Sequence, residues 1–272
     1  MSYITTRDNV KLYFKDWGKG RPVVMMHGWP LSSATFDDLS MALADAGLRA
    51  ISYDRRGFGR SQQTWDGYDY DTLADDLAAV LAETGARDAT LLGFSMGGGE
   101  VARYLSRHGA ANVKQAILVA SIVPYMLKTA DNPKGTDQAV FDQAGAAIKA
   151  DRAKFWAGFF KDFYGVGSGK QLVSDEVLEW SRDLSMHAGL KATLACAGAF
   201  ATTDFRPDLK AFTVPTLIIH GTEDKTVPID ASARAAAAGI ANSKLIEYEG
   251  GPHGLLASHK TRIIADVLQF VR

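Results

Sequence analysis

Short apolar runs alternate with segments of helical periodicity along the first half of the chain. Residues 2–18 alternate as a hairpin that turns at Asp8 and Asn9. PVVMMHG is a continuous apolar run that suggests a strand buried on both faces, and three more strand patterns follow: LRAISYD, ATLLGFS and VKQAILVAS. Between them lie three segments with helical spacing: FDDLSMALADAG, TLADDLAAVLAETG and GEVARYLSRHG. This order predicts a parallel α/β sheet with helices on both faces.

The alternation stops over residues 124–207. This segment has helical patterns, no convincing buried strand and many aromatic residues. The alternation then resumes with two strand patterns, VPTLIIHG and SKLIEYEG, and two helical ones, ASARAAAAGI and SHKTRIIADVLQFV. We therefore expect a mostly parallel α/β core made of residues 1–123 and 208–272, with residues 124–207 inserted as a helical cap.

Composition and charge exclude several classes of function. The chain has 272 residues and a formal net charge of −1, so it has no basic surplus for nucleic acid or an anionic membrane. No window approaches the roughly 18 apolar residues of a membrane span. The first residues, MSYITTRDNV, lack the apolar segment of a signal peptide, so we expect a cytoplasmic protein. The single cysteine, Cys196, excludes an intrachain disulfide and fits a small core residue better than a nucleophile.

A serine stands between two glycines where a buried-strand pattern meets a helical one. Residues 93–97 are Gly-Phe-Ser-Met-Gly, and two more glycines follow. Glycine in a helix interior lowers helix stability by roughly 1 kcal/mol relative to alanine, so these glycines must serve something other than local stability. In a nucleophile elbow, small neighbours let strand and helix approach closely, and the turn presents the hydroxyl at a helix N-terminus. A purely structural turn is the alternative, and the flanking strand and helix patterns favour Ser95 as a nucleophile.

A serine nucleophile needs a histidine base and a carboxylate that orients the histidine. Among six histidines, His253 is the best placed, because it lies in a Gly- and Pro-shaped loop between a strand and the final helix. Asp224 follows the strand TLIIH and is our choice for the acid, with Glu223 as the weaker alternative. The order Ser95, Asp224, His253 is the one that the α/β-hydrolase scaffold uses. Loops after parallel strands converge at one sheet edge, where such folds bind ligands.

An oxyanion hole is predicted beside this serine. The segment MMHGWP follows the first buried-strand pattern, and its loop supplies the backbone N–H of Trp29. The second donor is the N–H of Met96, directly after the nucleophile. Removing one such donor typically costs on the order of 100-fold or more in rate.

Other polar segments have structural interpretations. His27 and His220 each close a buried strand just before a glycine and fit structural hydrogen-bonding residues. The segment YDRRGFGRS lacks the Lys-Ser/Thr signature of a phosphate loop, and we expect a structural loop with salt bridges. The pairs Asp37-Asp38 and Asp75-Asp76 lie on helical patterns and are expected to be solvated. No clustered metal-ligand spacing is present in the sequence.

Six segments together resemble a known family: HGWP, YDRRGFGRS, GFSMGGGEVARYLSRHG, TDFRPDL, VPTLIIHGTED and PHG. They look like the α/β-hydrolases of the bacterial aryl-esterase and cofactor-free haloperoxidase (perhydrolase) group. The similarity runs over essentially the whole chain and is weakest at about 125–200. These motifs are specific for the superfamily and the subgroup, and not for the substrate.

The resemblance implies an esterase that acts through Ser95, His253 and Asp224, with Trp29 and Met96 as the oxyanion donors. Pro30 follows Trp29 as in members that make peracids efficiently, which implies hydrogen peroxide as a co-substrate beside the small-molecule ester. The chemistry needs no metal and no organic cofactor. Members of the group are often trimers or rings of trimers, so a homo-oligomer is expected.

The substrate pocket is expected beneath the cap aromatics, which are more often core than pocket. Some of them should still roof an apolar acyl or aryl pocket. The residues expected to bind substrate are Pro30, Phe159, Phe163, Phe200 and Val227. Two alternatives stay open: a lactonase or an amidase (γ-lactamase) with the same triad, and a non-catalytic homologue that binds a small ligand.

Overall fold

One mostly parallel sheet forms the centre of the molecule. The computed structural model describes residues 2–167 and 171–272, and within them eight strands are ordered β1-β2-β4-β3-β5-β6-β7-β8. Their bounds are β1 (Ser2–Thr5), β2 (Lys11–Gly18), β3 (Pro22–Met26), β4 (Arg49–Tyr53), β5 (Ala89–Phe94), β6 (Val113–Val119), β7 (Thr216–Gly221) and β8 (Ser243–Tyr248). Strand β2 is antiparallel to β1 and β4, and the pairs from β4 through β8 are parallel.

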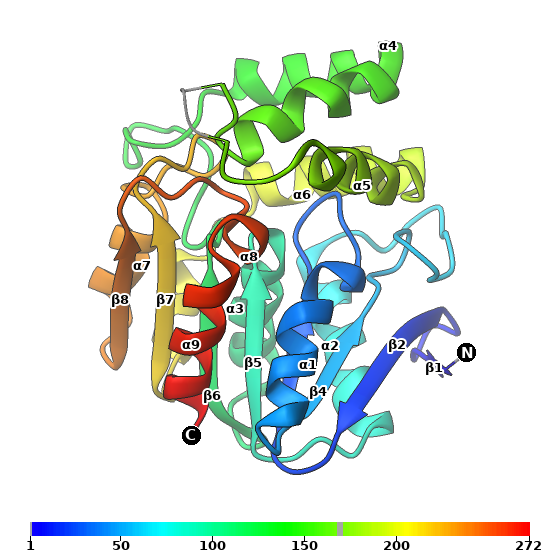
Figure 1. Cartoon of the computed structure of the whole chain (residues 1–272), viewed down its shortest axis with the longest axis vertical. Coiled ribbons are helices and arrows are strands. Elements are labelled where there is room, and N and C mark those ends of the chain that lie inside the picture. The colour runs from blue at the N-terminus through cyan, green and yellow to red at the C-terminus, as the bar shows by residue number, and fades with distance from the viewer. Residues whose placement is uncertain (1, 168–170) are drawn as a thin grey trace.

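Helices cover both faces of this sheet and one of its edges (Figure 1). They are α1 (Asp37–Asp45), α2 (Tyr70–Glu83), α3 (Met96–His108), α4 (Gln138–Phe163), α5 (Asp175–Met186), α6 (Leu190–Thr202), α7 (Ala233–Gly239), α8 (Leu255–Ser258) and α9 (Lys260–Val271), with short 3-10 turns at Ser33–Phe36 and Arg206–Ala211. In Figure 1, α1 and α9 lie in front of the sheet and α2 and α3 behind it. None of the helices in the described ranges is long and apolar enough to span a membrane.

The strand–helix alternation predicted from the sequence is confirmed. The hairpin pairs Thr5 with Lys11, and Asn9 takes a left-handed conformation (φ 64°) at its turn. The central strands β3 and β5 are buried along their whole length, as continuous apolar runs require. The predicted α/β fold class, with helices on both faces of a mostly parallel sheet, is therefore the observed one.

Helices α4, α5 and α6 lie above the edge of the sheet at which the parallel strands end (Figure 1). The long apolar pattern of α4 is interrupted at Asp151, whose backbone (φ −161°, ψ 88°) is not helical. The Asp151 carboxylate accepts a hydrogen bond from the N–H of Lys154 (2.9 Å), as an N-cap does, so the second half of α4 begins there. Helical periodicity alone gave no sign of this bend.

The YDRRGFGRS loop buries two ion pairs, as its expected structural role requires. Arg55 is 1% exposed and pairs with Glu100, while Arg56 is 2% exposed and pairs with Asp76 (2.6 Å). The expectation that Asp76 is solvated is wrong, because this carboxylate faces the core from α2 and is 2% exposed. A charged residue can face the core when a buried partner neutralises it, and the partner of Asp76 is Arg56, 20 residues upstream.

Cys196 is a core residue, as predicted. Its side chain is fully buried within the aromatic and aliphatic core cluster. Burial raises the pKa of its thiol to about 12. A thiol so far from its thiolate form is inert as a nucleophile at neutral pH.

Replacing Gly97 by alanine should destabilise the fold. A Cβ at this position would overlap the carbonyl oxygen of Met26, where α3 packs on the end of β3. We expect the free energy of unfolding to fall by about 1–3 kcal/mol, as overpacking usually costs, measured by urea unfolding. The matched control is Gly158→Ala on α4, where nothing lies within 4 Å of the added Cβ. That exposed helical position should gain up to about 1 kcal/mol, and equal losses in both variants would contradict the packing argument.

Candidate active site

Ser95 occupies a strained turn between β5 and α3. Its backbone angles are φ 53° and ψ −118°, a region that non-glycine residues rarely adopt. Backbone hydrogen bonds hold the turn: the Ser95 N–H donates to Val119 (2.9 Å), and its carbonyl accepts from the N–H of Gly98 (3.0 Å). Such strain persists only where the surroundings over-determine it, and it is common at functional sites.

The loop after β3 comes into direct contact with this turn. A Cβ on Gly28 would lie 2.9 Å from the ring of Phe94 and 3.1 Å from Cβ of Ser95. Only a residue without a side chain therefore lets the HGWP loop lie against the serine. In the elbow itself, a Cβ on Gly93 would meet the carbonyl of Gly97, and one on Gly97 would meet the carbonyl of Met26. These two glycines therefore permit close backbone approach, as the sequence predicted.

Three residues from separate loops form one chain of hydrogen bonds. Ser95 Oγ lies 2.9 Å from His253 Nε2, and His253 Nδ1 lies 2.6 Å from Asp224 Oδ2. The loops that carry them follow β5, β7 and β8, whose carboxyl ends share one edge of the sheet. With Nδ1–H donating to the carboxylate, Nε2 is free to accept the proton of the serine hydroxyl. Glu223, the weaker alternative for the acid, is exposed and takes no part in this chain.

Asp224 is fully buried and held by its own loop. Its Oδ1 accepts hydrogen bonds from the backbone N–H groups of Thr226 (2.9 Å) and Val227 (2.8 Å). His220 Nε2 lies 3.1 Å from Asp224 Oδ2, so this histidine, expected to be structural, supports the carboxylate. Burial alone would raise the pKa of Asp224, but the charge of His253 and the hydrogen bonds from both histidines outweigh it and hold that pKa well below its usual range.

The two predicted oxyanion donors flank the serine. The N–H of Met96 is the first of α3, and such groups have no acceptor within their own helix. The N–H of Trp29 lies in the loop that Gly28 brings against Ser95. Among the described residues, neither amide has a hydrogen-bond acceptor, so both remain available to an incoming oxygen.

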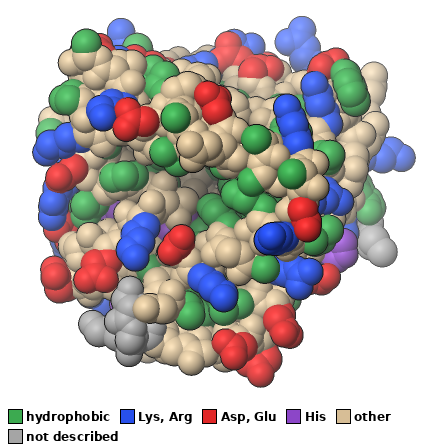
Figure 2. Space-filling view, turned by 90° about the horizontal axis from the view of Figure 1, so that it is seen from above, with side chains coloured by type: hydrophobic (Ala, Val, Ile, Leu, Met, Phe, Trp, Pro, Cys, Tyr) green, Lys and Arg blue, Asp and Glu red, His purple; other side chains and the backbone are tan. Residues whose placement is uncertain are grey.

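An apolar cavity of about 480 Å³ opens over Ser95. Figure 2 looks down on the cap and shows this face hollowed near its centre, with hydrophobic side chains around the hollow. The cavity lining combines the core loops with the cap: Trp29, Ser95, Ile122, Met126, Thr136, Val140, Phe141, Gln143, Ala144, Ala147, Phe155, Phe159, Asp162, Ala197, Phe200, Lys225, Thr226 and Val227. Its volume is within the range of small-molecule sites.

The residues predicted to bind substrate fall into two groups. Phe159, Phe200 and Val227 line this cavity. Phe163 does not line the cavity. Its buried ring packs edge-to-face against the imidazole of His253, with 4.8 Å between the ring centroids. Pro30 is buried in its loop, after a cis peptide bond to Trp29, and does not line the cavity either.

One wall of the cavity, from the first half of α4, was not among the predicted site residues. Val140, Ala144 and Ala147 lie on one face of this helix and line the cavity together with Phe141. Their spacing of three to four residues is the signal that could have found them, since it marks one helical face. Small side chains on that face leave the space that larger ones would fill.

The cap holds Trp29 through its side chain. The indole Nε1–H donates to the carbonyl of Thr193 on α6 (2.9 Å). Its rings make edge-to-face contacts with Trp156 (5.0 Å between centroids), Phe159 (5.7 Å) and Phe200 (5.4 Å). Trp29, whose amide is a predicted oxyanion donor, is thus positioned by α4 and α6 as well as by its own loop.

A buried polar network fixes the start of that loop. Arg55 Nη2 donates to the carbonyl of His27 (2.6 Å), and the Arg55 backbone N–H donates to His27 Nε2 (3.0 Å). Arg55 pairs with Glu100 on α3, which also accepts from the hydroxyl of Tyr53 (2.6 Å). His27, expected to be structural, therefore connects the HGWP loop to the helix that follows Ser95. Burial and the charge of Arg55 lower the pKa of His27 well below its usual value.

These features define a class of protein, and the comparisons with known proteins agree. A sequence profile of the alpha/beta hydrolase fold matches residues 21–260. The chain belongs to this family and is an enzyme of the hydrolase class.

Particular relatives narrow the group. The chain is 42% identical to "Non-heme chloroperoxidase CPO-A1" of Kitasatospora aureofaciens over 100% of this chain and 99% of that protein. It is 41% identical to "Bifunctional esterase/perhydrolase DCH" of Acinetobacter calcoaceticus over 100% of both. The crystal structure of a bromoperoxidase from Bacillus anthracis superposes with a TM-score of 0.96, at 41% identity over 99% of each chain. The resemblance to the haloperoxidase and esterase group is thereby confirmed.

Stability in mild acid should depend on His27. The folded state holds this imidazole neutral, whereas the unfolded chain protonates it below about pH 6.5. The unfolded state therefore binds the extra proton, and the free energy of unfolding falls by up to about 1.4 kcal/mol per pH unit below that value. The variant His27→Gln lacks this histidine and its protonation in the unfolded state. The difference in free energy of unfolding between wild type and the variant should therefore become smaller from about pH 7 to pH 5, as measured by urea unfolding.

The control for that measurement is His187→Gln, which changes an exposed histidine whose side chain makes no hydrogen bond among the described residues. We expect it to follow wild type at every pH. Parallel stability curves for wild type and His27→Gln would refute the role of His27.

Proposed function

We propose that the protein is a serine carboxylic ester hydrolase that acts through an acyl-enzyme on aryl or short-chain esters. The observation that carries this proposal is the hydrogen-bonded chain from Ser95 through His253 to Asp224, at the floor of an apolar cavity. A serine hydroxyl becomes a useful nucleophile when a base is within hydrogen-bonding distance and a third group orients that base. The short distances along this chain support the proposal.

Acylation begins when Ser95 Oγ attacks the ester carbonyl carbon and passes its proton to His253 Nε2, 2.9 Å away. Asp224 holds the imidazole in the required tautomer and stabilises the imidazolium that forms. The carbonyl oxygen, now negative, accepts hydrogen bonds from the amides of Trp29 and Met96. His253 Nε2–H then protonates the leaving alkoxide, the C–O bond breaks, and the acyl group remains on Ser95.

Deacylation reverses these roles. A water molecule gives its proton to His253 Nε2 and attacks the acyl carbon, which releases the carboxylic acid and restores the Ser95 hydroxyl. The apolar cavity walls accommodate the acyl or aryl group and keep other water away from the ester.

Hydrogen peroxide in place of water gives the second proposed activity, perhydrolysis. One peroxide oxygen attacks the acyl carbon, its proton goes to His253, and the products are a peracid and free Ser95. The O–O bond of the peracid then breaks as its terminal OH passes to halide, which gives hypohalous acid and leaves the carboxylate. The observation that favours this activity is the relative named as a bifunctional esterase/perhydrolase, which is 41% identical over the whole chain.

Ser95→Ala should abolish both activities. We expect a fluorophosphonate to add once to wild type and not at all to the variant, as read by intact mass. Turnover of a p-nitrophenyl ester and peracid formation should each fall by at least about 10⁴-fold, because removal of such a nucleophile removes the covalent pathway. The control is Ser258→Ala, since Ser258 Oγ also lies 2.9 Å from a histidine, His259, but outside the elbow. Full turnover by Ser95→Ala would refute the mechanism.

A matched pair of substitutions distinguishes Asp224 from Glu223 as the acid that orients His253. Asp224→Asn should lower kcat by about 10⁴-fold, because an amide next to Nδ1 stabilises the wrong imidazole tautomer. Glu223→Gln makes the same chemical change one residue away, at an exposed side chain, and should leave kcat within about twofold of wild type. A larger loss in Glu223→Gln than in Asp224→Asn would assign the acid to Glu223.

A further inference from the structure

A second hollow, of about 730 Å³, lies at the edge of the sheet opposite Ser95. Its lining comes from the amino ends of four neighbouring strands, β4, β3, β5 and β6. Pro22 begins β3, Arg49 begins β4, Asp88 precedes β5, and Lys114 is the second residue of β6. The hydrolase chemistry proposed above uses the carboxyl ends of the same sheet, so this hollow is separate from it.

The charges in this hollow are unbalanced. Arg21, Arg87 and Lys114 line it, and none of the three forms an ion pair within residues 2–167 and 171–272. Arg49 also lines it but is engaged by Asp16 (2.6 Å). Asp88 is the single acidic residue in the lining. Such a cationic cluster is unusual in a chain whose formal net charge is −1, where most other arginines have acidic partners.

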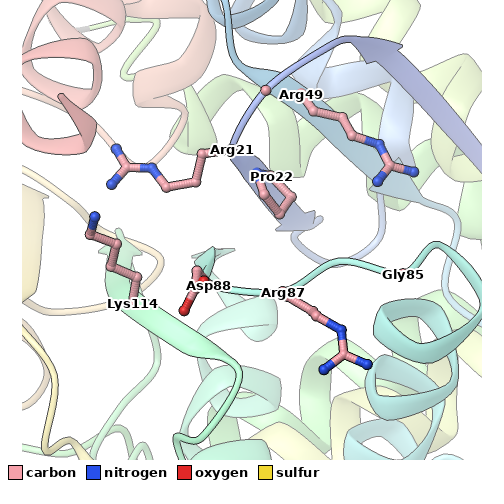
Figure 3. A pocket seen from close by; sticks show the side chains of 8 residues that line it. Arg21, Pro22, Arg49, Gly85, Arg87, Asp88 and Lys114 are labelled. Atoms are coloured by element: carbon pink, nitrogen blue, oxygen red, sulfur yellow. The ribbon is translucent and has the colours of Figure 1, made fainter.

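The cationic side chains extend to two ends of the hollow. Figure 3 shows Arg21 and Lys114 reaching toward one side of the view, and Arg49 and Arg87 toward the other. Asp88 lies between these two pairs. A ligand that spans the hollow therefore meets positive charge at both ends and a carboxylate near the middle.

We propose that this hollow binds a small anion that carries at least two linked phosphate groups. The planar guanidinium forks match phosphate oxygens in bidentate geometry, and Lys114 adds a point charge. Arg21 and Lys114 at one end and Arg87 at the other fit two phosphates better than one, while Arg49 stays paired with Asp16. The repulsion from Asp88 requires a multivalent anion to overcome it. The volume is that of a small-molecule site, and a chain with a net charge of −1 has no basic surplus for a nucleic acid.

Isothermal titration calorimetry with tripolyphosphate at low ionic strength tests the proposal. We expect one site on wild type and binding at least about tenfold weaker in Arg21→Ala/Lys114→Ala, because charge-assisted hydrogen bonds are lost. The control, Lys149→Ala/Arg182→Ala, removes one lysine and one arginine from exposed positions elsewhere and should bind as wild type does. Thermal unfolding of each variant establishes that it is folded.

Further titrants decide the ligand class. If ATP binds more tightly than tripolyphosphate, the occupant is a nucleotide. If ATP binds equally or more weakly, the occupant is a free polyphosphate. The proposal is wrong if tripolyphosphate does not bind, if both double variants lose affinity equally, or if citrate, a tricarboxylate, binds as tightly. Ester turnover is measured separately, so a failure here leaves the hydrolase proposal untouched.

Discussion

The close packing of α3 against the ends of β3 and β5 is the constraint on which the rest of the site depends. It holds Ser95 at a positive φ, begins α3 directly after this residue, and brings the Gly28 loop against the same turn. This packing needs glycine at two points, because a Cβ on Gly97 would meet the carbonyl of Met26 and one on Gly28 would meet the Phe94 ring and Ser95. The geometry of the nucleophile and that of the neighbouring amides are therefore set together.

The site is supported from below by buried charge and from above by aromatic packing. Arg55 and Glu100 tie the HGWP loop to α3 in a region without solvent, where breaking one partner would leave an uncompensated charge. The cap holds Trp29 through one hydrogen bond and several ring contacts. Helices α4 and α6 therefore contribute to the position of a candidate oxyanion donor, in addition to lining the cavity.

The two edges of the sheet carry different chemistry for a simple reason. Parallel strands gather their carboxyl ends on one side and their amino ends on the other, so loops of each kind cluster. The apolar cavity with its serine occupies the first edge, and the cationic hollow occupies the second. The buried strands β3 and β5 lie between the two clusters.

The sequence by itself determined the strand–helix order, the α/β class and the loops that hold Ser95, Asp224 and His253, because these depend on local periodicity and turn chemistry. Tertiary structure alone decided which side chains meet. Asp76 is buried because Arg56 reaches it, α4 bends at Asp151, and Phe163 packs on His253 while Val140 and Ala144 line the cavity. A helical pattern shows that one face is apolar but not what that face contacts, since the partner comes from a distant segment whose position only the folded chain fixes.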